Sequence, residues 1–276
     1  MIVAGIDIGS LSSEAVILED GEIMSYSIVL TGADTQRAAK TCMQEALEKA
    51  HLKFEAVSAT VATGYGRINV PFALKTVTEI TCHARGAHWL FPSTRTVIDM
   101  GGQDSKVISI DTEGRVLDFV MNDKCAAGTG RFLEVMAGAL EVDLMEMGER
   151  SIRAKDGIAI SSMCTVFAES EVISLIAGGC SKNDIIRGLH EAISKRIFTM
   201  AGKLRMEKPI TMSGGVAKNR GIVDALRRLL KAAIHVPEEP QIVGALGAAL
   251  SAWHLPSEAG MKNRGDWGGG SEDRAS

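Results

Sequence analysis

Short apolar runs rich in isoleucine and valine dominate the first half of the chain, and glycine or polar residues end each run. Such runs are typical of buried strands, because β-branched side chains favour strands and glycine supplies the turns between them. The pattern predicts strands over Ile2–Ile8, Glu14–Leu18, Ile23–Leu30, Val57–Ala62, Thr94–Met100, Lys106–Ile110, Arg115–Met121 and Ile210–Met212.

Apolar residues spaced three and four positions apart become more frequent in the second half, and this spacing predicts helices. The last expected helix consists mainly of alanine and glycine, and its small side chains permit close packing. The expected helices are Thr35–His51, Glu79–Leu90, Phe132–Leu140, Val166–Ala177, Ser181–Leu204, Arg220–Leu230 and Val243–Leu250. Strands and helices together indicate an α/β protein.

One unit of the pattern occurs twice. Ile6-Asp7-Ile8-Gly9-Ser10 and Ile98-Asp99-Met100-Gly101-Gly102 each place an acid near the end of an apolar strand, then a glycine turn and a hairpin. Two copies of one supersecondary unit predict a duplicated fold with two lobes. We expect the first lobe over residues 1–95 and the second over 96–255. Residues 256–276 are mostly glycine, serine and charged residues, with an isolated Trp267, which predicts a disordered tail.

Composition excludes several classes of function. The 276 residues carry a net charge of -4 and only 4% aromatic side chains, so neither the basic stripe nor the stacking platforms of a nucleic-acid binder are expected. No apolar run reaches the ~18 residues that a membrane span requires, and the N-terminus does not resemble a signal peptide. We therefore expect a cytoplasmic protein whose five cysteines are reduced.

The repeated acids and turns indicate phosphate chemistry. If duplication relates the lobes, Asp7 and Asp99 face each other, and the glycine turn after each acid offers backbone N–H groups to phosphates. Carboxylates suit Mg²⁺, which keeps several waters and takes few protein ligands. Gln103, directly after the second turn, can position an attacking water.

A second cluster of motifs surrounds two cysteines. Cys125 precedes the glycine turn that contains Gly128 and Thr129, which opens onto a predicted helix and offers a further phosphate cradle. Cys164 also comes just before a helix, so we pair it with Cys125 as a metal ligand. Two cysteines are half of the set that holds an iron–sulfur cluster, and a symmetric dimer supplies four. We interpret the remaining cysteines as structural or incidental: Cys42, Cys82 and Cys180.

A further glycine turn follows the last predicted strand. Gly214 and Gly215 permit the close approach of a purine or ribose, and Lys218 can stack or reach a phosphate. Gln241, before the small-residue helix, is a weaker candidate for the same site. A plain tight turn is the alternative interpretation.

These motifs resemble a known family. The two hairpins and the Gly-Gly turn are similar to the ATPase fold of actin, sugar kinases and heat-shock chaperones. The sequences Asn122-Asp-Lys-Cys-Ala-Ala-Gly-Thr-Gly-Arg, Ala168-Glu-Ser-Glu-Val and Asp99-Met-Gly-Gly-Gln-Asp resemble the activator components of 2-hydroxyacyl-CoA dehydratases more closely. The ATPase subunits of benzoyl-CoA reductases are also similar. The resemblance runs from about residue 2 to residue 253.

The resemblance implies a homodimer with one [4Fe-4S] cluster, held by Cys125 and Cys164 of both subunits. It also implies ATP or ADP in each subunit, with Gln103 helping hydrolysis and Gly214, Gly215 and Gln241 near the nucleoside. The implied first phosphate turn comprises Ser10, Leu11, Ser12, Ser13 and Glu14. Activators often carry a lysine where this chain has Glu14, which leaves the detailed phosphate contacts open.

The resulting hypothesis is an ATP-driven, one-electron donor. A ferredoxin or flavodoxin loads the cluster, and an iron–sulfur dehydratase or reductase component accepts the electron. One alternative is a permanent subunit of a benzoyl-CoA reductase-type complex. A second is a small-molecule kinase of the same fold, and a third is an actin-like filament or chaperone ATPase; both would be free of iron.

Overall fold

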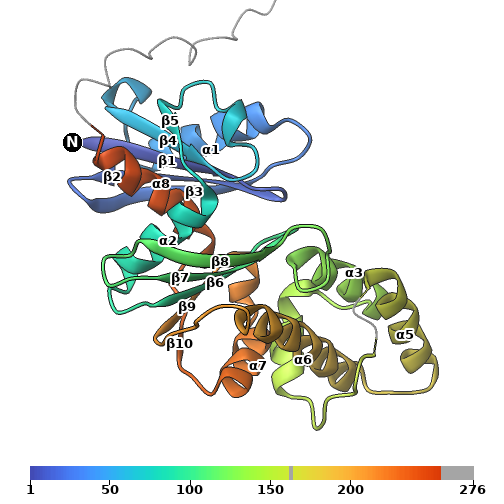
Figure 1. The fold of residues 1–276 in the computed structure, drawn as a ribbon. Helices are drawn as coiled ribbons and strands as arrows, with labels where there is room; N and C mark the ends of the chain where they lie inside the picture. Colours follow the sequence, from blue (N-terminus) through green and yellow to red (C-terminus); the bar gives the residue numbers. More distant parts are fainter. Residues whose placement is uncertain (162–163, 256–276) are drawn as a thin grey trace, which may run out of the picture. The chain divides into compact units, whose positions relative to one another are not determined.

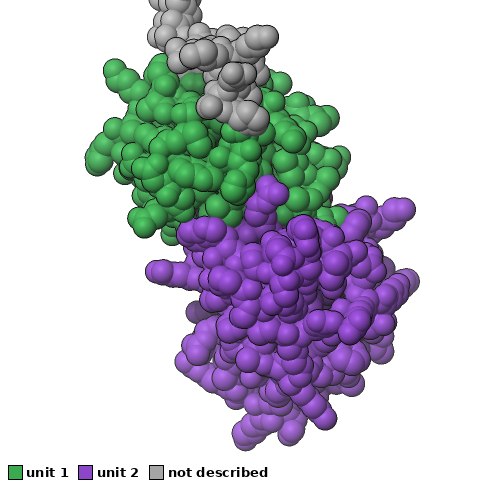
Figure 2. Space-filling view, turned by 60° about the vertical axis from the view of Figure 1, so that its left-hand side comes forward, with its two compact units in different colours: residues 1–82, 244–276 green, residues 83–243 purple. Residues whose placement is uncertain are grey.

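The computed structural model describes residues 1–161 and 164–255, and the predicted tail over 256–276 lies outside these ranges. The chain forms two compact units (Figures 1 and 2): residues 1–82 with the chain from residue 244 onward, and residues 83–243. The small-residue helix near the end of the chain is therefore part of the first unit. Among the described residues, no helix is both long and apolar enough to cross a membrane.

The first unit is built on one five-stranded sheet with the order β3-β2-β1-β4-β5. β1 runs antiparallel to β2 and parallel to β4. The strands are β1 Ile2–Ile8, β2 Ser12–Glu19, β3 Glu22–Leu30, β4 Ala59–Thr63 and β5 Lys75–Thr76.

Two helices cover opposite faces of the first sheet. α1 (Thr35–Lys49) packs Ala39 and Met43 against Ile6 and Ile17. α8 (Val243–Trp253) lies so close to the other face that a side chain at Gly5 would collide with its backbone. The shorter elements of this part of the chain are η1 Phe54–Ala56 and η2 Arg67–Asn69.

The second unit repeats the same sheet. Its order is β10-β9-β6-β7-β8, so the antiparallel hairpins β6-β7-β8 correspond to β1-β2-β3 and the parallel strand β9 corresponds to β4. The strands are β6 Thr96–Met100, β7 Ser105–Ile110, β8 Val116–Asn122, β9 Ile210–Ser213 and β10 Ile234–His235. The predicted duplication of the fold is thus present strand by strand.

Helices cover the second sheet over a large apolar core that includes Ile98, Val107, Phe132, Ile193 and Met212. α3 packs against α5, and α6 packs against α7 (Figure 1). The helices are α2 Glu79–Leu90, α3 Gly130–Leu140, α4 Met147–Ile152, α5 Thr165–Ala177, α6 Lys182–Ala201 and α7 Arg220–Leu230, and the 3-10 turns are η3 Leu144–Glu146, η4 Gly215–Lys218 and η5 Pro240–Ile242.

Differences between the predicted and the observed helices and strands are confined to the ends of elements and to short elements. α1 stops at Lys49 rather than residue 51, because His51 adopts a left-handed conformation with φ 55°. α6 stops at Ala201 rather than residue 204. The prediction missed β5, α4 and β10, and the second half contains two strands after β8 where one was expected.

His190 gives the second unit a pH-dependent stability. Its ring is buried between α6 and α7, and this burial lowers its pKa from the ordinary 6.5 to about 3. The unfolded chain takes up this proton below about pH 6.5 and the folded chain does not. Folding stability is therefore fully present above pH 6.5 and is expected to fall by about 1.4 kcal/mol per pH unit below it.

Denaturant unfolding at pH 7 and pH 5.5 measures this effect. His190→Leu should flatten the pH dependence, whereas His51→Asn, a change at an exposed histidine, should leave it unchanged. An equally steep slope in the His190→Leu variant would contradict the assignment.

Candidate nucleotide and metal site

The two predicted phosphate hairpins close with the same turn. In the first unit, the Gly9 N–H donates to the Ser12 carbonyl at 3.0 Å, and in the second unit the Gly101 N–H donates to the Asp104 carbonyl at 3.0 Å. Asp7 and Asp99 precede these turns and are almost completely buried. Gln103 is exposed on the second turn, beside Gly102. Each unit therefore contains one acid and one tight glycine turn in the same relative position.

Asp99 lies in a fully partnered polar site. Lys106 Nζ lies 3.2 Å from one of its oxygens, and the Ser213 hydroxyl donates to the other at 3.0 Å. His83 Nδ1 lies 3.3 Å from the same oxygen as Ser213. Burial opposes ionisation, but His83, Lys106 and Ser213 together hold the pKa of Asp99 below its ordinary value. Asp99 is consequently a carboxylate at neutral pH.

The predicted nucleoside residues come together in the second unit. Gly214 has φ 82°, and a Cβ there would lie 2.9 Å from an Asp99 oxygen, so only glycine fits this turn. The side chain of Gln241 lies against Gly215. Lys218 forms an ion pair with Glu239 at 2.9 Å. Gly214, Gly215, Gln241 and Lys218 thus form one local site.

The cysteine loop joins the end of β8 to the start of α3. The Asn122 side-chain amide donates to the carbonyls of Cys125 at 2.7 Å and Ala127 at 3.3 Å. Thr129 is buried, and its hydroxyl donates to the Ala126 carbonyl at 2.6 Å. The loop is therefore fixed from inside by Asn122 and Thr129, and Cys125 is half-buried on it.

The same loop is hydrogen-bonded to the second phosphate turn. The Gly130 N–H donates to the Gly101 carbonyl at 2.9 Å, and the Arg131 N–H donates to the Gly102 carbonyl at 2.8 Å. The first turn of α3 therefore holds the turn that carries Gln103. These two hydrogen bonds connect the turn to the start of α3, which lies five residues after Cys125.

Cys164 occupies the N-cap of α5 and is exposed. α5 packs against α3, so the two helices that follow the candidate ligands are neighbours (Figure 1). Several apolar side chains of α5 face solvent in the single chain: Val166 and Phe167 are each 66% exposed and Ile173 is 53% exposed. Large apolar side chains that gather in exposed positions on one helix are typical of an interface.

Two of the other three cysteines differ from this pair, because Cys42 and Cys82 are completely buried. Cys180 is partly buried and packs against the core of the second unit, as Cys125 does. Burial, with a smaller contribution from the charge of Glu14, raises the pKa of the Cys42 thiol well above its ordinary value. Cys42 is therefore a neutral thiol, which fits the structural role expected from the sequence. Within the described ranges, no three His, Cys, Asp or Glu side chains of this chain gather as a metal site.

Comparison with known proteins places the chain in a family, because a family description matches residues 4–252. The chain belongs to the BadF/BadG/BcrA/BcrD ATPase family. It is an ATPase, and the family resemblance predicted from the hairpin and cysteine motifs is confirmed.

Members of this family resemble the chain over nearly its whole length. An activator of lactoyl-CoA dehydratase from Anaerotignum propionicum is 50% identical over 92% of this chain and 98% of its own. The solved activator of the 2-hydroxyisocaproyl-CoA dehydratase from Clostridium difficile, with bound ADPNP, shares 45% identity over 94% of this chain and 96% of its own, with a TM-score of 0.89.

The predicted fold is confirmed by a more distant structure. A ROK family glucokinase from Streptomyces griseus covers 92% of this chain, and this chain covers all of it, with a TM-score of 0.56. Its 15% identity establishes a shared fold alone. The family therefore uses the duplicated, sugar-kinase type of architecture expected from the repeated hairpins.

One feature of the first unit was not predicted as part of a site. Gly64 follows β4 as Gly214 follows β9, and its φ of 83° matches that of Gly214. A side chain at Gly64 would collide with the Asp7 carboxylate, as one at Gly214 would crowd Asp99. The Gly64-Tyr65-Gly66 turn was visible in the sequence, but its relation to Asp7 depends on strand order, which places β4 beside β1.

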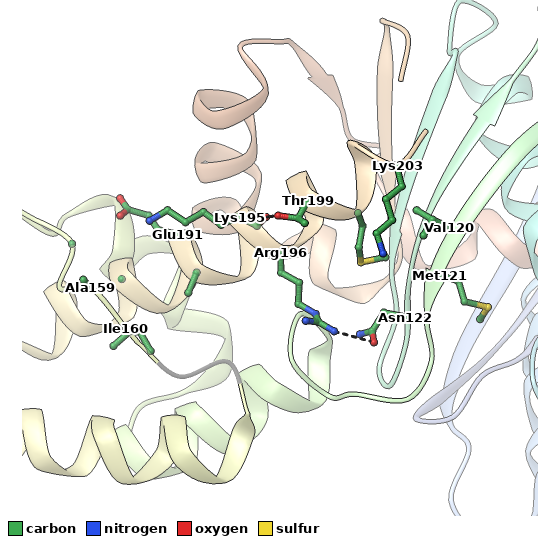
Figure 3. Close-up of a pocket in the computed structure, with 14 residues that line it drawn as sticks. Val120, Met121, Asn122, Ala159, Ile160, Glu191, Lys195, Arg196, Thr199 and Lys203 are labelled. Carbon is green, nitrogen blue, oxygen red and sulfur yellow. Dashed lines mark hydrogen bonds between the residues drawn. The ribbon is translucent and has the colours of Figure 1, made fainter. Parts of the chain in front are cut away.

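A pocket of about 640 Å³ in the second unit was also not predicted (Figure 3). It lies between the end of β8, residues 157–160 and α6, and Lys195, Arg196 and Lys203 are among its lining residues. Arg196 donates to the Asn122 side-chain oxygen at 3.2 Å, and Asn122 in turn holds the cysteine loop. The pocket therefore lies next to Asn122, the residue that fixes the cysteine loop. No local sequence pattern predicts this relation.

Proposed function

We propose that this ATPase activates a 2-hydroxyacyl-CoA dehydratase by delivering single electrons in an ATP-dependent manner. The relatives of highest identity discussed above carry the name of dehydratase activators. The observation that carries the proposal is the pair of hydrogen bonds from Gly130 and Arg131 to the Gly101–Gly102 turn. They link the turn that we propose contacts the phosphates to a loop that carries a cysteine.

Cys125 and Cys164 from each of two chains would hold one [4Fe-4S] cluster per homodimer. Thiolates are the ligands of such clusters, and both cysteines precede a helix whose N-terminus favours negative charge. When bound, the cluster supplies one-electron transfer. The exposed apolar side chains of α5 begin directly after Cys164, so a dimer that buries them would place Cys164 of both chains at the interface.

ATP and Mg²⁺ would bind through the repeated elements. Asp7 and Asp99 would bind Mg²⁺ through water, and the two hairpin turns would approach the phosphates, with Gly128 and Thr129 near the second turn. Gln103 would orient the attacking water without acting as a strong base. The remaining nucleotide contacts are assigned to Gly214, Gly215, Lys218 and Gln241, which form one local site.

Coupling would follow from the hydrogen-bonded turn. A change in the phosphates shifts the turn at Gly101, and the shift reaches Cys125 through the start of α3. A reduced ferredoxin or flavodoxin would supply the electron, and the dehydratase would receive it. The acyl-CoA substrate would bind the dehydratase and not this chain.

The second candidate function is that of a permanent subunit in a benzoyl-CoA reductase-type complex. One of the subunits of benzoyl-CoA reductase from Thauera aromatica is 31% identical over 90% of this chain. Purification separates the two functions, because a free activator elutes as a homodimer and a reductase component remains in a larger complex. The higher identity to activators favours the first candidate.

Anaerobic purification with iron analysis tests the shared cluster. The protein is expected to elute as a dimer with about four iron atoms per dimer. Phe167→Asp should give iron-free monomers, because a charge would replace an apolar contact of α5. Leu117→Asp, an equally exposed apolar position on β8, is the matched control and should remain dimeric. An iron-containing monomer would exclude a cluster shared between two chains.

A further inference from the structure

The pocket between β8 and α6 has a cationic end. Arg196 and Lys203 both line it and are seven positions apart, so they lie on the same side of α6 and of the turn that continues it. Figure 3 shows both side chains beside the end of β8, with Arg196 reaching Asn122. Among the described residues, no acid forms an ion pair with either cation. The pocket therefore holds two positive charges at this end, in a chain whose net charge is -4.

Arg196 is fixed in position and still has donors to offer. Its guanidinium donates to the Asn122 side-chain oxygen at 3.2 Å, and its side chain packs over Gly128, where a Cβ would lie 3.3 Å from Arg196 Cδ. The bond to Asn122 uses one of the five guanidinium N–H donors. Nε is buried and has no acceptor among the described residues, although most buried donors have one. An oxyanion is the acceptor that a guanidinium binds best, because it can take two parallel hydrogen bonds.

The acid at the other end of the pocket does not cancel these charges. Glu191 lies on the side of Lys195 and residues 159–160, away from Arg196 in the close-up (Figure 3). Its carboxylate pairs with Arg187 at 3.2 Å and lies 3.8 Å from Arg228. The charge of Glu191 is therefore balanced by arginines of its own.

The rest of the lining is suited to more than a bare anion. Val120, Met121, Ile160 and Met200 contribute apolar side chains. The volume of about 640 Å³ lies within the range of about 300–1,000 Å³ that is usual for pockets of small organic ligands. An inorganic phosphate would leave most of this space and the apolar lining unused. The combination fits an anion that carries an apolar body.

We propose that this pocket binds an organic phosphate. The phosphate group contacts Arg196 and Lys203, and the organic body lies against Val120, Ile160 and Met200. The pocket is an anion site separate from the one proposed for ATP, because none of its lining residues is among the proposed nucleotide contacts. The inference does not depend on the proposed electron transfer, since it concerns only the lining of one pocket in the second unit.

Isothermal titration calorimetry of the full-length protein tests the site, with ADP present at saturation so that the nucleotide site is filled. Monobutyl phosphate is expected to bind at one site per chain. Inorganic phosphate should bind at least about tenfold more weakly, because it has no apolar surface to bury. Lys203→Gln and Arg196→Gln should each weaken binding of monobutyl phosphate by about tenfold or more, since each removes a hydrogen bond between charged groups.

A matched control separates the pocket from the general charge of the helix. Lys182→Gln removes a cation at the start of α6 that does not line the pocket, and it should bind monobutyl phosphate as the unmodified protein does. Lys203 is exposed, so its replacement tests the site even if Arg196→Gln disturbs the cysteine loop. Unchanged affinity in Lys203→Gln, equal affinity for the two phosphates, or no binding would each overturn the proposal. Binding that disappears when ADP is added would place the phosphate in the nucleotide site and would also overturn it.

Discussion

Replacing Cys125 with alanine is expected to abolish the EPR signal of the reduced cluster and to remove bound iron, while nucleotide binding persists. A four-thiolate cluster shared by two chains loses two ligands when one position is changed, because each chain contributes the same cysteine. The nucleotide contacts proposed at Gly214, Gly215 and Gln241 lie on other elements of the second unit. EPR of the anaerobically reduced protein and equilibrium binding of ADP measure the two outcomes separately.

The other cysteines provide the comparison. Cys164→Ala should give the same loss. Cys180→Ala should retain the signal, since Cys180 is not a proposed cluster ligand, although it is partly buried like Cys125. A reduced-cluster signal that survives Cys125→Ala would rule out that ligand. A signal lost in all three variants would indicate general damage to the fold, which a thermal unfolding measurement detects.

Gln103→Ala is expected to lower ATP hydrolysis by roughly 10²–10³-fold, with little change in ATP affinity. Gln103 is exposed on the turn closed by Gly101 and Asp104, so its side chain is placed to orient water and does not support the core. Steady-state phosphate release and nucleotide binding under identical conditions distinguish hydrolysis from affinity.

Glu113→Gln is a suitable control for this change. Glu113 lies between β7 and β8, at the opposite end of β7 from Gln103, and is exposed. The control should hydrolyse ATP at the unmodified rate. If Gln103→Ala hydrolyses ATP equally fast, another group positions the water.

The duplicated sheet could be predicted because its signal is local and occurs twice. An acid, a glycine turn and alternating apolar strands identify the hairpins at Asp7 and Asp99 without knowledge of the rest of the fold. The helices were found from their apolar periodicity, and α2 was predicted with its observed ends. β5 and β10 were missed because two residues are too few for any periodic pattern to appear.

The relations between motifs could not be predicted in the same way. The pairing of Glu14 with Asp7, and of Thr63 with Asp7, depends on the register of three strands. The hydrogen bonds from Gly130 and Arg131 to the second turn join segments almost thirty residues apart through backbone atoms alone. Every residue type except proline has the same backbone donor, so the pattern of side chains in a sequence does not predict such contacts.

Through the hydrogen bonds between the Gly101–Gly102 turn and the start of α3, the cysteine loop can also affect nucleotide binding. If a nucleotide changes the free energy of the cysteine loop, the state of that loop must change nucleotide affinity by the same factor. Protein that lacks the proposed cluster is therefore not a neutral reference for ATP binding. The ATP affinities of protein with and without the proposed cluster are therefore expected to differ.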